Sequence, residues 1–567
     1  MISFKQLKPI ILSAVLFIAT FANAQQDNKL KMWYHADLVQ DTLNGISLKQ
    51  AYDFLKDKQP VPVIVAVLDS GIDTTQEDLK NMLWTNPGEI PGNGIDDDKN
   101  GYIDDVHGWN FLGNKNGTNL DNAGGENARV YYRFKSEFEG KNIDTSSLSF
   151  LEKWRYDEWK RAEQEMAIGP QEQMEVTFLE NIMTILKKND STLRVDMQKE
   201  EFNSDDLEKY QPVSEDAKKA KNVFLNIYKQ LGVESGTTNV SLVKDLEEYT
   251  KGKKAGLEAK LAPPPDYRAL TIKDDYNNFN DRYYGNNDIM GPDPRHGTHC
   301  SGIIGAQRNN GIGINGIAGN PKDLKIMMVR TVPDGDEYDK DVALAIMYAV
   351  NNGAKVISMS FGKKFSPEKP WVDSAVKYAA SKDVLLVHAA GNDNQDVDSV
   401  PNFPSPWMLA DNKKANNFIT VGASGDPRIG DGNAIAGFSN YGAKNVDVFA
   451  PGVNIYSTLP GGDKYGNLSG TSMAAPVVSG IAALIRSYYP FLSAKQVIYA
   501  LEQSVVPGTA LKGKITIPGT DKEVNMLDLA VSGGEVNAYN ALKIASTLKP
   551  DNLNNPKDTG QKKKNKN

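Results

Sequence analysis

The sequence is poor in cysteine and in long apolar stretches. Its 567 residues include one cysteine, Cys300, so no internal disulfide bond can form. A chain without disulfides draws its stability from core burial or from bound metal ions. Beyond the N-terminal leader no run approaches the roughly 18 to 20 apolar residues that span a bilayer, which predicts no transmembrane segment in the mature chain.

A surplus of basic residues is also absent. Lys and Arg number 64 against 72 Asp and Glu, and the formal net charge is −8. Nucleic acid binding needs a basic field over the surface, so we exclude nucleic acid as a partner. The exception is the KKKNKN end of a Pro-, Asn- and Lys-rich stretch, and we interpret residues 549–567 as a disordered basic tail.

The N-terminus has the pattern of an export signal. Lys5 and Lys8 precede an apolar run, which ends in Ala22-Asn23-Ala24, a small-x-small cleavage pattern. A buried N-terminal helix is the alternative, but it does not explain this order of features. We predict a signal peptide over 1–24, a short lead segment over 25–60, and a mature protein that is secreted or periplasmic/extracellular.

Short β-branched runs predict a buried parallel sheet. Residues 61–68 read VPVIVAVL between Pro60 and Asp69, as expected for a strand buried on both faces. Similar runs lie at 325–329, 355–359, 384–388 and 418–421, with helical stretches at 341–351 and 373–381 between them. This alternation predicts an α/β, three-layer α/β/α domain with a mostly parallel central sheet, formed by 61–125 and 286–548.

Residues 126–285 differ in composition from the segments on either side. They are dense in Glu, Lys, Asp and Gln, and apolar residues recur at helical spacing in 150–166, 174–187 and 217–231. A long charged loop is the alternative, but the periodicity argues against it. We predict a mainly α-helical insertion that projects from the edge of a cleft, because it returns to the core domain at 291–295.

Three segments carry residues suited to catalysis. Asp69 follows the first predicted strand, where open α/β sheets place their sites. His296 opens the glycine-rich segment HGTHCSGIIGA, and Ser472 precedes an apolar helix whose N-terminal dipole would stabilise an oxyanion. Taken singly, these residues could equally be a turn aspartate, a structural histidine and an N-cap serine.

Together the segments VLDSGID (67–73), HGTHCSGIIG (296–305) and GTSMAAPVVSG (470–480) resemble the three motifs of the subtilisin-like serine peptidases, in that family's order. The resemblance implies a secreted serine endopeptidase acting on proteins or peptides without an organic cofactor. It implies that Ser472 is the nucleophile, His296 the general base and acid, and Asp69 the orienting carboxylate. Asn392, in AAGND at 389–393, corresponds to the oxyanion donor.

The same resemblance implies a substrate-binding surface. One side should be an edge strand that pairs with the substrate main chain, and the other should wall a mostly apolar pocket for the side chain before the scissile bond. The residues are Ser360, Phe361 and Gly362 on the first side, and Ala389, Ala390 and Gly391 on the second. We also expect Asp393 at the pocket rim, where it would modestly favour basic residues.

The acidic run DDDKNGYIDD at 96–105 predicts a structural calcium site. Oxygen-bearing residues alternate around a glycine, as in calcium loops. The twelfth position is His107 and not Glu, so the run is not a full EF-hand. A solvated acidic turn is the alternative, but carboxylates this close repel each other without a cation. The candidate ligands are Asp96, Asp98, Asn100, Tyr102, Asp104 and Asp105.

Two features depart from the usual family pattern. The separation of Asp69 from His296 is far longer than in most relatives, and the insertion accounts for it. The segment 25–60 is too short for the usual folding-assistant pro-domain, so we hypothesise that the insertion guards the site or assists folding.

Two other functions remain open, a catalytically silent scaffold and a processing peptidase of narrow specificity. We expect Cys300 to be a buried filler, and His299 and His388 to be structural.

Overall fold

The computed structural model describes residues 30–230, 237–320, 322–429 and 432–551. The predicted signal peptide and residues 552–567 of the predicted tail lie outside the described residues. Within these ranges, none of the helices has the length and apolarity needed to cross a membrane.

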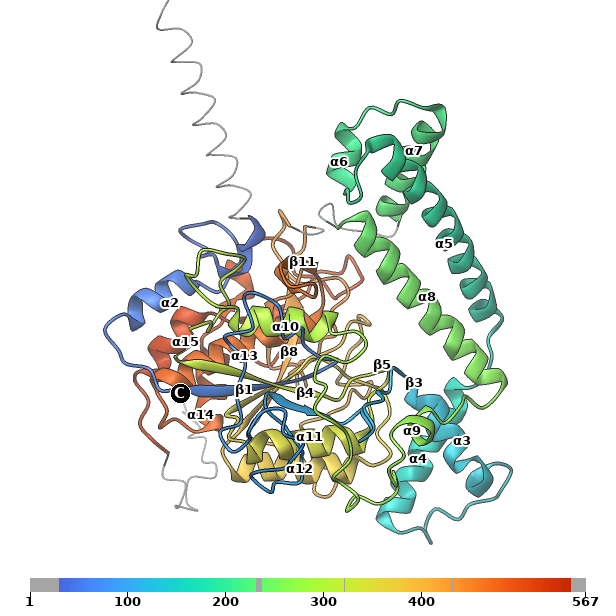
Figure 1. Ribbon diagram of the computed structural model, residues 1–567, viewed down its shortest axis with the longest axis vertical. Helices are drawn as coiled ribbons and strands as arrows, with labels where there is room; N and C mark the ends of the chain where they lie inside the picture. Colours follow the sequence, from blue (N-terminus) through green and yellow to red (C-terminus); the bar gives the residue numbers. More distant parts are fainter. Residues whose placement is uncertain (1–29, 231–236, 321, 430–431, 552–567) are drawn as a thin grey trace, which may run out of the picture.

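A nine-stranded sheet forms the centre of the protein (Figure 1). Its order is β12-β13-β9-β8-β7-β6-β1-β4-β2, and every neighbouring pair is parallel except β12 and β13. This confirms the predicted α/β fold with a mostly parallel sheet. The strands are β1 (Val63–Asp69), β2 (Gly108–Asn110), β4 (Leu324–Arg330), β6 (Val356–Met359), β7 (Leu385–Ala389), β8 (Phe418–Ser424), β9 (Val448–Pro451), β12 (Val506–Pro507) and β13 (Gly534–Glu535).

Helices cover both faces of the sheet, because its central strands are apolar on both faces. One face carries α2 (Leu48–Leu55), α10 (Arg295–Gly305), α13 (Thr471–Tyr488), α14 (Ala494–Gln503) and α15 (Ala538–Ala545), and the other carries α11 (Asp339–Asn351) and α12 (Lys369–Ser381). Almost every residue of α13 is buried, so this helix forms the centre of the larger core.

The lead segment is part of the same core. Trp33 is fully buried, and its indole nitrogen donates a hydrogen bond to the carbonyl of Val453 at 3.1 Å. Helix α2 packs against α15, close to the C-terminal end of the domain. Three short 3-10 helices complete the domain: η1 (Trp33–His35), η2 (Gly508–Ala510) and η3 (Met526–Asp528).

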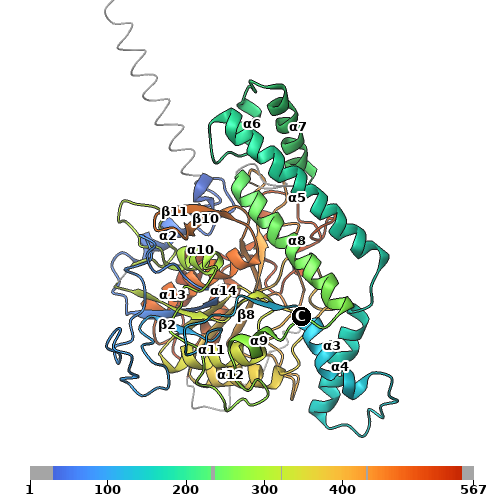
Figure 2. The ribbon, with the colours of Figure 1, turned by 45° about the vertical axis from the view of Figure 1, so that its right-hand side comes forward.

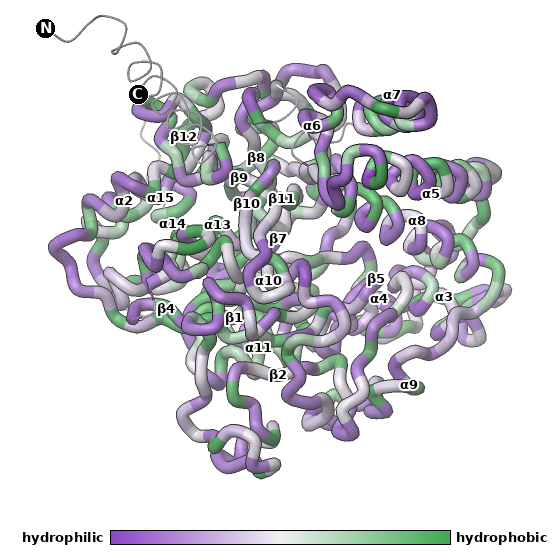
Figure 3. The backbone as a smooth tube through the Cα atoms, turned by 45° about the horizontal axis from the view of Figure 1, so that its top comes forward, coloured by the Kyte–Doolittle hydropathy of each residue, from purple (hydrophilic) through white to green (hydrophobic). Residues whose placement is uncertain are grey.

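The predicted insertion is helical along most of its length, with α3 (Glu126–Phe138), α4 (Phe150–Glu165), α5 (Pro170–Met197), α6 (Ser204–Lys209), α7 (Glu215–Gln230), α8 (Asn239–Leu261) and α9 (Tyr267–Thr271). Helices α3 and α4 pack on the sheet domain through Trp159 and Phe365. Helices α5 to α8 form an arm beside the domain (Figures 1 and 2), with a core of its own around Leu186 and Phe224. The alternating colours of α5 and α7 in Figure 3 match this one-sided burial.

Two small two-stranded sheets lie outside the central sheet. β3 (Asn122–Gly124) pairs in parallel with β5 (Asp334–Gly335), and this pair joins the start of the insertion to the segment after β4. β10 (Ile455–Leu459) and β11 (Lys464–Leu468) form an antiparallel hairpin before α13. Residues of β5 and β11 line the same cleft, which is described below.

Candidate active site

The three predicted catalytic residues come from three elements that meet at the carboxyl edge of the sheet. Asp69 is the last residue of β1, His296 is the second residue of α10, and Ser472 is the second residue of α13. A glycine allows α10 to approach β1 closely, since a Cβ at Gly297 would lie 2.2 Å from the carbonyl oxygen of Gly71. Gly297 of the histidine motif therefore permits close packing between α10 and the end of β1.

Asp69 and His296 form the central pair of the site. His296 Nδ1 lies 2.7 Å from Asp69 Oδ1, and the same oxygen accepts a hydrogen bond from the Ser70 N–H at 2.8 Å. Asp69 is almost fully buried. Burial is the largest single effect and acts to lower the pKa of His296, but the charge and hydrogen bond of Asp69, together with Cys300, raise that pKa well above its usual value.

The Ser472 hydroxyl lies in the same cleft but is not bonded to His296. It donates a hydrogen bond to the backbone carbonyl of Ser360 at 3.0 Å. In return, the Ser360 hydroxyl donates to the carbonyl of Ser472 at 2.9 Å. These two bonds link the start of α13 to the segment after β6, which is the predicted substrate-binding strand.

Asn392 is oriented by Thr471, the neighbour of Ser472. Its side-chain oxygen accepts hydrogen bonds from the Thr471 N–H at 2.8 Å and from the Thr471 hydroxyl at 2.9 Å. That hydroxyl in turn accepts a bond from the Gly391 N–H at 3.0 Å. With its oxygen engaged, Asn392 presents its amide NH₂ group as a donor.

A cleft of about 940 Å³ contains these residues, and the helical arm forms one of its walls. Leu242, Asp245, Glu248 and Lys251 of α8 line the cleft together with His296, Asn392 and Ser472. Three ion pairs hold α8 there: Arg295 with Asp245 at 2.6 Å, Lys244 with Asp293 at 3.0 Å, and Lys251 with Asp334 at 2.8 Å. Two of these pairs involve residues within three positions of His296.

A side pocket of about 410 Å³ opens beside Ser472. Of the predicted substrate-binding residues, Phe361, Gly362, Ala389 and Gly391 line it, and Ser360 lines the cleft. Ala390 is buried behind the pocket, where its carbonyl accepts a hydrogen bond from the Asn402 side chain at 2.9 Å. Asp393 also lines the pocket, together with residues that the sequence did not indicate, which include Asn127, Glu165, Asp336, Lys363, Lys364, Phe365 and Asn402.

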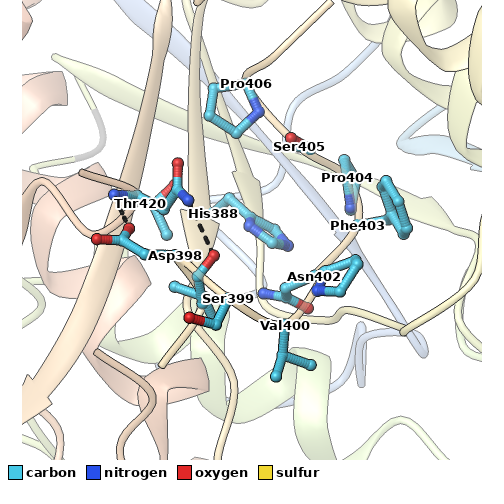
Figure 4. A pocket seen from close by; sticks show the side chains of 13 residues that line it. His388, Asp398, Ser399, Val400, Asn402, Phe403, Pro404, Ser405, Pro406 and Thr420 are labelled. Atoms are coloured by element: carbon cyan, nitrogen blue, oxygen red, sulfur yellow. Dashed lines mark hydrogen bonds between the residues drawn. The ribbon is translucent and has the colours of Figure 1, made fainter. Parts of the chain in front are cut away.

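A second cavity of about 190 Å³ lies on the other side of Asn402 (Figure 4). His388 faces it and its Nε2 lies 2.8 Å from the carbonyl oxygen of Phe361, while burial lowers the pKa of His388 to about 4. His299 is similar, with a pKa of about 3. Both are neutral histidines buried in the fold. Cys300 is also buried, and its sulfur lies 3.3 Å from the carbonyl oxygen of Ser472.

The acidic loop forms a different cluster from the alternating one that the sequence suggested. Carboxylate oxygens of Glu89, Asp96 and Asp98 lie within 4.8 Å of one another. Glu89 is buried, and its Oε2 has no hydrogen-bond partner among the described residues. A buried carboxylate oxygen without a donor, beside two further carboxylates, fits a bound cation.

The other four predicted ligands have different surroundings. The Asp104 carboxylate accepts backbone N–H bonds from residues 92–94, and Asp105 accepts bonds from Asn86, Asn100 and Tyr348. The ring of Tyr102 packs edge-on against Trp109. Glu89 was not predicted from the sequence because it lies outside the alternating run, and only folding brings it beside Asp96.

Comparison with known proteins assigns the chain to a family. The model of the subtilase family matches residues 62–534. A thermophilic serine proteinase of Bacillus sp. (strain AK1) is 40% identical over 34% of this chain and 42% of its own length. The major intracellular serine protease of Bacillus subtilis (strain 168) is 35% identical over 44% of this chain and 74% of its own.

Among solved structures, the prenylagaramide maturation protease PagA aligns with 44% of this chain and 82% of its own, at 27% identity and a TM-score of 0.35. The family match covers most of the chain and includes the three motifs that form the site. The chain therefore belongs to the subtilase family.

Proposed function

We propose that the protein is an exported serine endopeptidase that cleaves proteins or peptides through an acyl-enzyme on Ser472. The observation that carries the proposal is the meeting of Asp69, His296, Ser472 and Asn392 in one cleft. No requirement of folding brings a buried carboxylate, a histidine, a serine and an amide donor together at one place. A catalytically silent scaffold would not need to keep all four.

The first chemical step follows from these contacts. The Ser472 hydroxyl turns from the Ser360 carbonyl toward His296, which accepts its proton as the oxygen attacks the peptide carbonyl. Asp69 stabilises the imidazolium that results. The Asn392 amide and the Ser472 N–H donate to the oxyanion. His296 then returns the proton to the leaving amine, and water hydrolyses the acyl-enzyme by the same route.

The backbone after β6 is suited to hold an extended substrate. Gly362 is exposed, and among the described residues neither its N–H nor its carbonyl has a hydrogen-bond partner. A substrate strand can pair with such a free edge, and main-chain pairing is independent of the substrate's sequence. Selectivity must therefore come from the side pocket and from the cleft walls.

The arm favours restricted access over broad digestion. Because α8 lines the cleft and is held by three ion pairs, a substrate must pass between the arm and the sheet domain. An unfolded chain can enter such a channel more easily than a compact folded protein. This supports a processing peptidase, in which the insertion guards the site.

Structural calcium and export complete the proposal. Glu89, Asp96 and Asp98 would hold a Ca²⁺ ion, which would neutralise carboxylates that otherwise repel one another. The predicted signal peptide supports export to the periplasm or the extracellular medium. One relative is named as an intracellular protease, so export needs its own test, which is the N-terminal sequence of protein recovered outside the cytoplasm.

The decisive experiment compares purified residues 25–567 with the Ser472→Ala variant, in calcium. We expect a fluorophosphonate probe to label the wild type once, by intact mass, and the wild type to hydrolyse an unfolded protein. Both properties should be lost in the variant. If neither the folded wild type nor a folded variant without the arm is labelled, the proposal would be overturned in favour of a silent scaffold.

A further inference from the structure

The side pocket beside Ser472 contains carboxylates from both the insertion and the sheet domain. Glu165 is the last residue of α4, and it reaches the pocket together with Asn127 from α3. Asp336 and Asp393 line the same pocket from the segments after β5 and β7. Two insertion helices, distant in sequence from the catalytic motifs, thus help to form the pocket that receives a substrate side chain.

The charges in this pocket do not cancel. Glu165 and Asp393 are exposed, and among the described residues no ion pair joins either carboxylate to a lysine or arginine. The carboxylate of Glu165 accepts a bond only from the neutral Asn127 amide, at 3.4 Å. Lys363 is buried and engaged by Glu126 and Asp339, at 3.0 and 2.9 Å, which leaves Lys364 as the unpaired lining cation. Asp336 accepts a hydrogen bond from the Glu126 N–H at 2.6 Å, so two unpaired carboxylates, Glu165 and Asp393, face one unpaired ammonium group.

The shape of the pocket suits a long side chain. Phe361, Ala389 and Gly391 offer apolar surface near the nucleophile. Asn402 closes the inner end, and Gly362 leaves space there, because a Cβ at this position would lie 2.8 Å from the Asn402 amide oxygen. An aliphatic stem can lie along the apolar wall while its charged end interacts with the exposed carboxylates of Glu165 and Asp393, which line the same pocket.

We propose that this pocket selects a lysine or arginine before the scissile bond, and that Glu165 of the insertion is a specificity-determining residue. The proposal rests on the proposed peptidase activity and names its substrate class. It also assigns the insertion a second role, since its α3–α4 part helps to form the pocket while its α5–α8 arm walls the cleft.

The test uses matched peptides that differ only in the residue before the cleavable anilide, which is lysine or norleucine. Norleucine has the stem of lysine without the ammonium group, so the ratio of the two kcat/KM values isolates charge recognition. We expect the wild type to prefer lysine, and the Glu165→Gln variant to lower the ratio about twofold to fivefold, as for an exposed ion pair. Glu165→Lys, which reverses the charge, should lower it by about the square of that factor.

Glu163→Gln is the matched control, because Glu163 lies on the same helix, pairs with Lys160 and does not line the pocket. It should keep the wild-type ratio. Hydrolysis of both peptides with a ratio that Glu165→Gln and Glu165→Lys leave unchanged would overturn this inference and leave the peptidase proposal intact. Hydrolysis of neither peptide, with no fluorophosphonate labelling, would overturn both.

Discussion

The hydrogen bonds around Asn392 lead to a quantitative prediction about Thr471. Asn392→Ala removes the proposed oxyanion donor and should lower kcat about a hundred- to a thousandfold. Thr471→Val keeps the shape of the side chain but removes the hydroxyl that holds the Asn392 oxygen and accepts the Gly391 N–H. The bond to the Thr471 N–H remains, so Asn392 is loosened but not released.

One neutral hydrogen bond contributes about 0.5–1.5 kcal/mol, so Thr471→Val should lower kcat about twofold to twelvefold with little change in KM. Thr471→Ser retains the hydroxyl and should restore most of the loss. Active-site titration with the fluorophosphonate corrects each rate for the folded fraction.

A double-mutant cycle separates positioning from general damage. If Thr471 acts through Asn392, adding Thr471→Val to Asn392→Ala should cost little further activity, because the donor is already gone. Independent losses that multiply in the double variant would refute the reasoning. So would a Thr471→Ser variant as slow as Thr471→Val.

Three further predictions follow from the same structure. Neutral His296 is the proposed base and Asp69 raises its pKa, so kcat/KM should rise with pH through that pKa. The Asp69→Asn variant should shift this rise to lower pH, while kcat falls about ten-thousandfold. A pH profile that does not shift would contradict Asp69 as the cause of the raised pKa. Chelation of calcium should lower the thermal midpoint, by the equivalent of about 2.7 kcal/mol if calcium is at a hundred times its Kd. Calorimetry should show a smaller decrease on chelation in the Glu89→Gln variant and the wild-type decrease in the control variant Glu137→Gln. Equal decreases in both variants would exclude Glu89 as a ligand. Replacing residues 171–259 by a short glycine linker should leave kcat/KM for the norleucine peptide within about threefold of the wild-type value, because the arm has its own core. The shortened protein should give more cleavage products from an unfolded protein, as counted by mass spectrometry. An unchanged product pattern would argue against a guarding arm.

Much of the fold, and the meeting of Asp69, His296 and Ser472 in one cleft, could be predicted from sequence, because the information is local. The β-branched run 61–68 is followed by alternating helical and apolar stretches, as expected for a buried strand of a parallel sheet. Strand β1, Val63–Asp69, begins two residues after this run begins and ends one residue after it ends. Asp69, His296 and Ser472 stand at element ends, and parallel strands bring such ends to one edge. The family match to residues 62–534 agrees with this interpretation.

The tertiary structure alone decided which distant residues surround those motifs. Glu89 joins Asp96 and Asp98 only when the loop closes, and Glu165 reaches the side pocket only when α4 packs on the sheet domain. The α8 wall likewise depends on ion pairs between segments about fifty or more residues apart. Periodicity along the chain reports which face of an element is buried, but it does not report what the element packs against. The sequence by itself therefore determined the fold and the motif residues that meet in the cleft, and packing decided the walls, the charge of the pocket and the third carboxylate of the acidic cluster.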